Sequence, residues 1–283
     1  MNITAFITEL GKPELAFLRN AIWLGVLAGP VLGVIGSMVV TRRISGLAGA
    51  SAHTALGGVG IALFLQRVAG LSWCSGHLGA VAGAVAAALL VGVVSIYAKE
   101  REDTIIAVVW ALGMATGLLF LDRTPGYVDW QGYLFGNILL ISRESLVMTA
   151  ALDVLVLVPA VIFYNSVLAA TFDPVFAQLR GLPVNLICLL LLFLTALTIV
   201  LLINIVGIIL VIALLTLPAA SAGCATRHLW SMMLGATLLS WLFIVGGLLL
   251  SFFADLPAGP VIVVAASAVY LLLLCAGRML KKN

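Results

Sequence analysis

Charged residues are scarce in this chain of 283 residues. Asp, Glu, Lys and Arg make up 9% of it, whereas hydrophobic residues make up 64%. A soluble globular domain carries about 25% charged residues. The composition therefore excludes a soluble domain and predicts a single membrane domain over residues 1–283. The apolar runs do not alternate with polar residues as the strands of a membrane barrel do, so we expect an all-α, polytopic protein.

Several chemical signatures are also missing. The sequence has no glycine-rich phosphate loop, no nucleotide fingerprint and no pair of catalytic carboxylates. We expect a chain that is not an enzyme and has no cofactor of its own, so any ATP would be bound by a partner. The net charge of +3 reflects loop residues and gives no reason to expect a nucleic-acid partner. Cys188 and Cys275 fall inside apolar runs, so the four cysteines predict no disulfide framework.

The apolar runs predict the number of membrane spans. From Gly181 to Thr226 there is no charged residue. As one helix this run would be about 69 Å long, more than twice the ~30 Å hydrocarbon core, so the chain must turn back near Asn204 and Gly207. If residues 185–223 bend rather than turn back fully, the chain has eight spans. We predict nine, at residues 16–40, 52–70, 77–98, 104–121, 146–168, 185–203, 206–223, 230–252 and 259–277.

Basic loop residues predict the orientation. Cytoplasmic loops are enriched in Lys and Arg. If the spans alternate, most basic residues gather on one side, with Arg123 and Arg143 as exceptions. This places the N-terminus outside and the C-terminus inside. The residues assigned to the cytoplasmic side are Arg42, Arg43, Lys99, Arg101, Arg180, Arg227, Arg278, Lys281 and Lys282.

A polar island, Thr171–Pro183, interrupts two long apolar runs. Asp173 and Pro174 favour a helix start, because Asp accepts from free backbone N–H groups and Pro is tolerated in the first turn. Gly181 and Pro183 favour a helix stop and restart. We expect a helix of about two turns on the cytoplasmic face, a suitable docking surface for a separate motor protein.

Few polar side chains fall within spans, and those that do are functional candidates. They are His53, Asn204 and Asp153. Neutral imidazole is a common ligand of zinc and its neighbours. The alternative for His53 is a helix-end histidine bonded to a neighbouring carbonyl. Ser51 suggests an intramembrane hydrolase, but residues two apart on a helix point about 200° away from each other, so His53 cannot be its base.

Weaker signals concern metals, packing and gating. A soft metal could bind to Cys74 with His77, or to Cys224 with His228, although zinc sites need three or four ligands.

Glycines at spacing four in the first and third spans predict close helix packing, within the chain or against a second copy. The aromatic loop around 122–145, including 132–136, predicts interfacial anchoring or a gate on the outer face.

Six segments, in register over nearly the whole length, resemble the permease subunit of bacterial ABC importers for zinc, manganese and iron. They are Arg42-Arg43 with Gly49 to Gly58, Lys99 to Thr104, Val128 to Ser142, Phe172-Asp173-Pro174 with Arg180-Gly181, Val206 to Ala222, and Asp255 to Pro260. The resemblance implies two permease copies, two cytoplasmic ATPase subunits and an extracytoplasmic metal-binding protein. It further implies a bacterial inner-membrane location.

The resemblance also assigns roles to residues. It implies that Phe172, Asp173, Pro174, Arg180 and Gly181 couple the chain to the ATPase, and that His53 lines the ion path. The family usually has an aspartate one turn before this histidine, where this chain has Gly49. Manganese prefers oxygen ligands, so the missing carboxylate favours zinc. Import of manganese, iron or a chelated metal is the alternative, followed by an autonomous secondary transporter.

Overall fold

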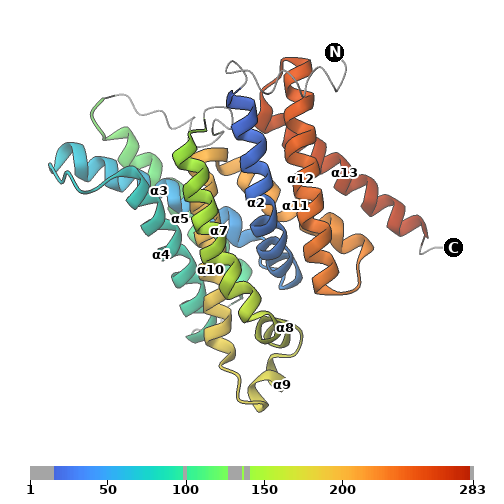
Figure 1. Ribbon diagram of the computed structural model, residues 1–283. Coiled ribbons are helices and arrows are strands. Elements are labelled where there is room, and N and C mark those ends of the chain that lie inside the picture. The colour runs from blue at the N-terminus through green and yellow to red at the C-terminus, as the bar shows by residue number, and fades with distance from the viewer. Residues whose placement is uncertain (1–15, 98–100, 127–135, 137–140, 281–283) are drawn as a thin grey trace.

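The structure is a computed structural model that describes residues 16–97, 101–126, 136 and 141–280 (Figure 1). All regular elements in these ranges are helices. Nine of them are long and apolar enough to cross a membrane, in agreement with the nine predicted spans. They are α2 (Ala16–Thr41), α3 (Gly46–Val68), α4 (Gly76–Tyr97), α5 (Glu102–Asp122), α7 (Arg143–Ile162), α10 (Val184–Val206), α11 (Ile208–Ala225), α12 (Leu229–Ala254) and α13 (Ala258–Leu280).

The spans form two groups joined by central helices (Figure 1). On one side α3 packs between α4 and α5, and on the other α11 packs against α12 and α13. Between them, α2 packs on α12, α7 and α11, whereas α10 packs on α4, α3 and α7. Two short helices, α8 (Tyr164–Phe172) and α9 (Pro174–Leu179), lie together at one end of the bundle.

Glycines let the helices of both groups approach closely. A Cβ atom at Gly57 or Gly60 of α3 would lie 2.7 Å or 2.6 Å from a carbonyl oxygen of α5. Glycines of α2 leave room for α12 to pack equally closely. There the indole of Trp241 in α12 donates to the carbonyl of Val26 in α2 at 3.0 Å. The predicted small-residue packing is thus found within one chain. The α2 glycines concerned are Gly25, Gly29 and Gly33.

The turn between the sixth and seventh spans lies at Gly207, as the length of the apolar run requires. Gly207 has φ 85° and ψ 159°, a conformation that L-residues with a side chain rarely adopt. It separates α10 from α11 and therefore supports nine spans over eight. A Cβ atom at Gly136 would lie 2.3 Å from the carbonyl carbon of Val206 and 2.4 Å from the nitrogen of Gly207, so Gly136 approaches this turn closely.

Two predicted helix boundaries are wrong. The second span begins at Gly46 rather than 52, because the small residues before His53 pack as a helix against α5. The fifth span ends at Ile162 rather than 168. Pro159 cannot donate to the carbonyl one turn back, and the break follows at Phe163, after which α8 begins. The orientation of the termini stays a prediction, because residues 1–15 and 281–283 lie outside the described ranges.

Candidate functional site

His53 is the eighth residue of α3, and its imidazole is partly buried. Its Nδ1 lies 2.9 Å from the carbonyl oxygen of Gly49. A carbonyl oxygen can only accept, so Nδ1 carries the hydrogen in this bond. The neutral ring then presents an unprotonated Nε2, the atom that can bind a metal ion. The carbonyl bond expected in the alternative interpretation is present, and it leaves the ligand role open.

The ring of His53 also contacts Trp110 of α5. The two ring centroids are 4.9 Å apart, with the planes tilted by 37°. A Cβ atom at Gly49 would lie 2.5 Å from Cζ3 of Trp110, so the missing side chain makes room for the indole. Thr54 fixes the adjacent backbone, because its hydroxyl donates to the carbonyls of Ala50 at 2.7 Å and Val109 at 3.3 Å. His53 is therefore held between its own helix and α5.

An apolar groove of about 720 Å³ opens next to this site. Thr54 lines it at one end, and the loop residues Trp73, Cys74 and Ser75 line it at the other. Its walls are the facing surfaces of α3 and α4, with Thr116 contributed by α5. The groove thus extends along the bundle from the neighbourhood of His53 to the loop between α3 and α4.

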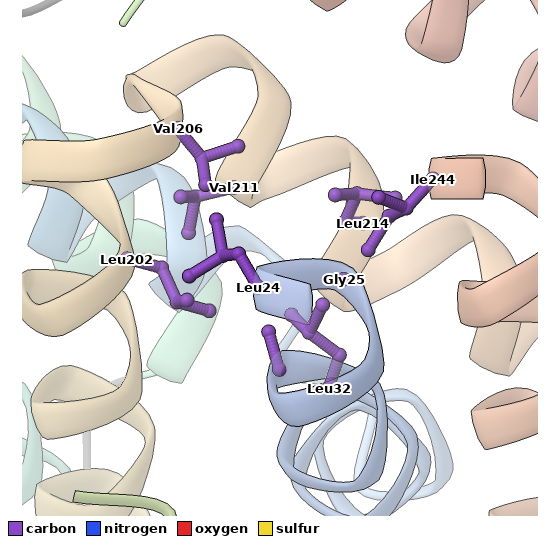
Figure 2. Close-up of a pocket in the computed structure, with 9 residues that line it drawn as sticks. Leu24, Gly25, Leu32, Leu202, Val206, Val211, Leu214 and Ile244 are labelled. Atoms are coloured by element: carbon purple, nitrogen blue, oxygen red, sulfur yellow. The ribbon is translucent and has the colours of Figure 1, made fainter. Parts of the chain in front are cut away.

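A second, much smaller cavity lies where α2 meets α10, α11 and α12 (Figure 2). Its volume is about 10 Å³, and only apolar groups line it. A water molecule or an ion needs polar partners, so this cavity offers no ligand site. Its labelled lining residues are Leu24, Gly25, Leu32, Leu202, Val206, Val211, Leu214 and Ile244.

The other sequence candidates do not assemble into a metal site. Cys74 is buried whereas His77 is exposed. Cys224 and His228 are both exposed, and the Cys224 thiol lies 3.4 Å from the Ala220 carbonyl. Across the described residues, no group of three or more His, Cys, Asp or Glu side chains could hold a metal ion. The outer-loop gate and the side chain of Asn204 lie outside the described residues.

The remaining polar candidates in spans give no catalytic arrangement. The Ser51 hydroxyl is fully buried and has no hydrogen-bond partner among the described residues, so it has no base there. Asp153 lies in the middle of α7 and is partly buried.

The short helix predicted within the polar island is present as α9 (Pro174–Leu179). Asp173 caps α9, accepting from the Phe176 amide at 2.9 Å, and Pro174 occupies the first turn. The helix ends at Leu179, after which Gly181 adopts φ 77°. The Arg180 guanidinium lies 4.7 Å from the centroid of the Phe176 ring, a cation–π contact that the sequence analysis missed.

Large apolar side chains of this segment are exposed outside the spans. Leu179 is 83% exposed and Phe172 66%, and Val175 and Phe176 are exposed as well. Only Ala177 of α9 is buried. An exposed apolar cluster of this kind marks an interaction surface.

The sequence also did not predict a polar cluster that lies at the ends of four spans. Arg42 follows α2, and its guanidinium lies 3.1 Å from Glu102 of α5 and contacts the Cys188 sulfur of α10. Ser95 of α4 donates to the same Glu102 oxygen at 3.0 Å. Burial opposes the charge of Arg42, but the Cys188 sulfur and the Glu102 carboxylate more than offset this, so the pKa of Arg42 is raised. Because charged residues are so scarce in this sequence, Arg42 and Glu102 could have been singled out from the sequence as candidates for such a cluster.

Known proteins are similar to this chain over almost its whole length. An uncharacterized membrane protein of Synechocystis sp. is 40% identical over 257 residues, which cover 90% of this chain and 89% of that protein. The manganese transport system membrane protein MntC of Halalkalibacterium halodurans is 34% identical over 272 residues, covering 96% and 90%. Among solved structures, PsaBC from Streptococcus pneumoniae in complex with Fab matches with a TM-score of 0.80 and 29% identity, covering 96% and 95%.

The nine apolar helices and these relatives make the chain a multi-pass bacterial membrane protein. The sequence profile described as the ABC 3 transport family matches residues 14–277. This match spans far more than half of the chain, and it agrees with the family suggested by the six sequence segments. The chain belongs to the ABC 3 transport family.

Proposed function

We propose that this chain is the permease subunit of an ATP-driven importer for a divalent transition metal ion, and that zinc is its cargo. The observation that carries the proposal is the 2.9 Å contact between Nδ1 of His53 and the Gly49 carbonyl, which leaves Nε2 as the nitrogen for a metal, in a span with no other ionisable side chain near it. Intramembrane histidines mark ion pathways. Membership of an ABC transport family supplies the link to ATP.

The ion path would run past His53. The groove begins at Thr54 and ends at the loop after α3. The ion path would follow this groove along the bundle. Among the residues that the structure describes, one chain supplies a single ligand there, whereas stable metal sites need three or four. A second permease copy would add its own His53, with water completing the shell. Such a sparse site binds weakly, which lets the ion leave again.

The 171–183 segment would couple this path to ATP hydrolysis. Its exposed apolar side chains, Phe172, Val175, Phe176 and Leu179, form a surface suited to docking on an ATPase subunit. Two copies of the permease would engage two cytoplasmic ATPases, with an extracytoplasmic protein delivering the metal from outside the inner membrane. Closure of the ATPases would then tilt the spans around His53 and alternate its access.

Manganese is the principal alternative cargo, because three of the similar proteins are named manganese transport system membrane proteins. Iron and chelated metals follow. Zinc is favoured because no carboxylate lies one turn from His53, where Gly49 leaves the position without a side chain. An autonomous secondary transporter would instead take up metal under a proton gradient without any ATPase.

Uptake of radioactive zinc, manganese and iron by cells that lack the chromosomal copy tests the proposal. We expect the wild-type gene to restore ATP-dependent zinc uptake, and His53→Ala to remove most of it while the assembled complex still purifies. His53→Gln serves as a control for packing against Trp110. Unchanged uptake in His53→Ala would exclude this residue from the path, and no deficit for any metal would exclude the cargo class.

A further inference from the structure

A hollow of about 480 Å³ lies between the starts of α2 and α7, at the end of the bundle opposite α8 and α9 (Figure 1). Both helices begin a membrane span there, so the hollow lies at the boundary between the membrane and water. Its lining residues are Arg19, Asn20 and Trp23 of α2 and Arg143, Leu146 and Val147 of α7. Two arginines from different helices therefore share one hollow.

The part of the chain that the structure describes neutralises neither arginine. The ion pairs found there involve other residues. Glu144 follows Arg143 directly, but it does not line the hollow and pairs with neither arginine in the described ranges. Arg19 is only partly exposed, so its charge is partly withdrawn from water. Because a desolvated charge is costly without a partner, the hollow favours an anion from outside the chain.

Hydrogen bonds fix the backbone on both sides of the hollow. Nδ2 of Asn20 donates to the carbonyl of Ile141 at 2.9 Å, which ties α2 to the residues directly before α7. Ser142 then caps α7 by accepting from the amide of Ser145 at 3.1 Å. The two arginines are thus carried on helix starts that are linked to each other, and an anion would meet a pair of cations already brought together.

The rest of the hollow is apolar and open to the surroundings. Trp23 is 55% exposed and Val147 71%. Tryptophan is typical of the membrane–water boundary. A phospholipid matches both parts of this surface, because its phosphate suits the planar guanidinium groups and its acyl chains suit the apolar side chains. Free phosphate would match only the arginines and would leave Trp23 and Val147 uncovered.

We propose that this hollow binds an anionic phospholipid, with the phosphate between Arg19 and Arg143 and an acyl chain against Trp23 and Val147. A lipid with a zwitterionic headgroup binds less well, because its own cation is repelled by the two arginines. The bound lipid joins the start of α7 to α2 and so stabilises the folded bundle by mass action. The inference depends neither on the proposed cargo nor on ATP.

Native mass spectrometry of the full-length permease in detergent measures lipid binding. The probes are phosphatidylglycerol and phosphatidylcholine with the same acyl chains. We expect the wild type to prefer phosphatidylglycerol, and Arg19→Gln/Arg143→Gln to lower the affinity for it about 10-fold or more, because hydrogen bonds between charged groups are lost. Arg123→Gln/Arg227→Gln is the matched control. It removes the same net charge at exposed positions outside the hollow and should bind as the wild type does.

Three results would overturn the inference. Equal losses in the two double variants would mean that net charge alone attracts the lipid. Displacement of phosphatidylglycerol by an excess of inorganic phosphate would mean a site for a free anion. Unchanged lipid binding in Arg19→Gln/Arg143→Gln, with a lost affinity for the extracytoplasmic protein, would mean a protein contact surface. If that double variant fails to fold, Arg143→Gln alone changes an exposed side chain and must weaken phosphatidylglycerol binding several-fold.

Discussion

The guanidinium of Arg42 lies 3.1 Å from the carboxylate of Glu102, and the two side chains are only 17% and 28% exposed. Arg42 joins α2 to α3, the helix that carries His53, and it also contacts Cys188 in the second turn of α10. The α10 helix begins directly after the 171–183 segment. Arg42 therefore links the loop before the His53 helix both to α5, through Glu102, and to the helix that follows α9, through Cys188.

Arg42→Ala should destabilise the protein, because it leaves the half-buried Glu102 without its cation. Removing one partner of a buried pair costs about 3–5 kcal/mol, and we expect about 2 kcal/mol for this more exposed one. Thermal unfolding of the purified permease in detergent measures the loss. Arg42→Ala/Glu102→Gln should recover part of it, because no unpaired charge remains. A double variant as unstable as the sum of the two single variants would show that the pair does not interact.

Asp173→Ala should weaken ATPase binding without affecting the membrane bundle. The carboxylate caps α9 through the Phe176 amide, and loss of such a cap costs about 1 kcal/mol. In a helix of six residues this is enough to lower the population of the docking conformation several-fold. Titration of purified ATPase onto the reconstituted permease measures the affinity. Asp173→Ser retains a capping oxygen and should bind nearly as the wild type does, whereas equal losses in both variants would contradict the capping role.

The sequence predicted the side-chain chemistry at the ends of helices and the close packing at glycines, but it did not predict which side chains meet between helices. The cap at Asp173 and the turn at Gly207 are local consequences of residue type. The start of α3 was missed because Gly46 to Ala52 is too weakly hydrophobic to resemble a span. The contact of Trp110 with Gly49 depends on which faces of α3 and α5 meet, and no spacing within either helix specifies that. The same holds for Arg42, whose partners Glu102 and Cys188 come from two separate helices, α5 and α10.

Gly207→Ala should destabilise the turn between α10 and α11. Its φ of 85° and ψ of 159° lie in a region that is nearly restricted to glycine, where a side chain costs about 1–3 kcal/mol. Thermal unfolding in detergent again gives the readout. Gly246→Ala in α12 is the matched control, because a Cβ atom there meets nothing within 4 Å. Alanine in a helix interior is favoured over glycine by up to about 1 kcal/mol, so this control should be neutral or stabilising. Equal losses at both positions would contradict the backbone argument.

His53 should hold its proton on Nδ1 when it is neutral, because the Gly49 carbonyl at 2.9 Å can only accept a hydrogen bond. Nitrogen NMR of protein labelled at its three histidines distinguishes the two tautomers, and His53→Gln assigns the signal by its loss. Addition of zinc should then shift the unprotonated Nε2 resonance and leave Nδ1 protonated, because the metal and the carbonyl use opposite sides of the ring. A proton on Nε2 would leave no nitrogen lone pair facing the path, and His53 could not then act as the ligand.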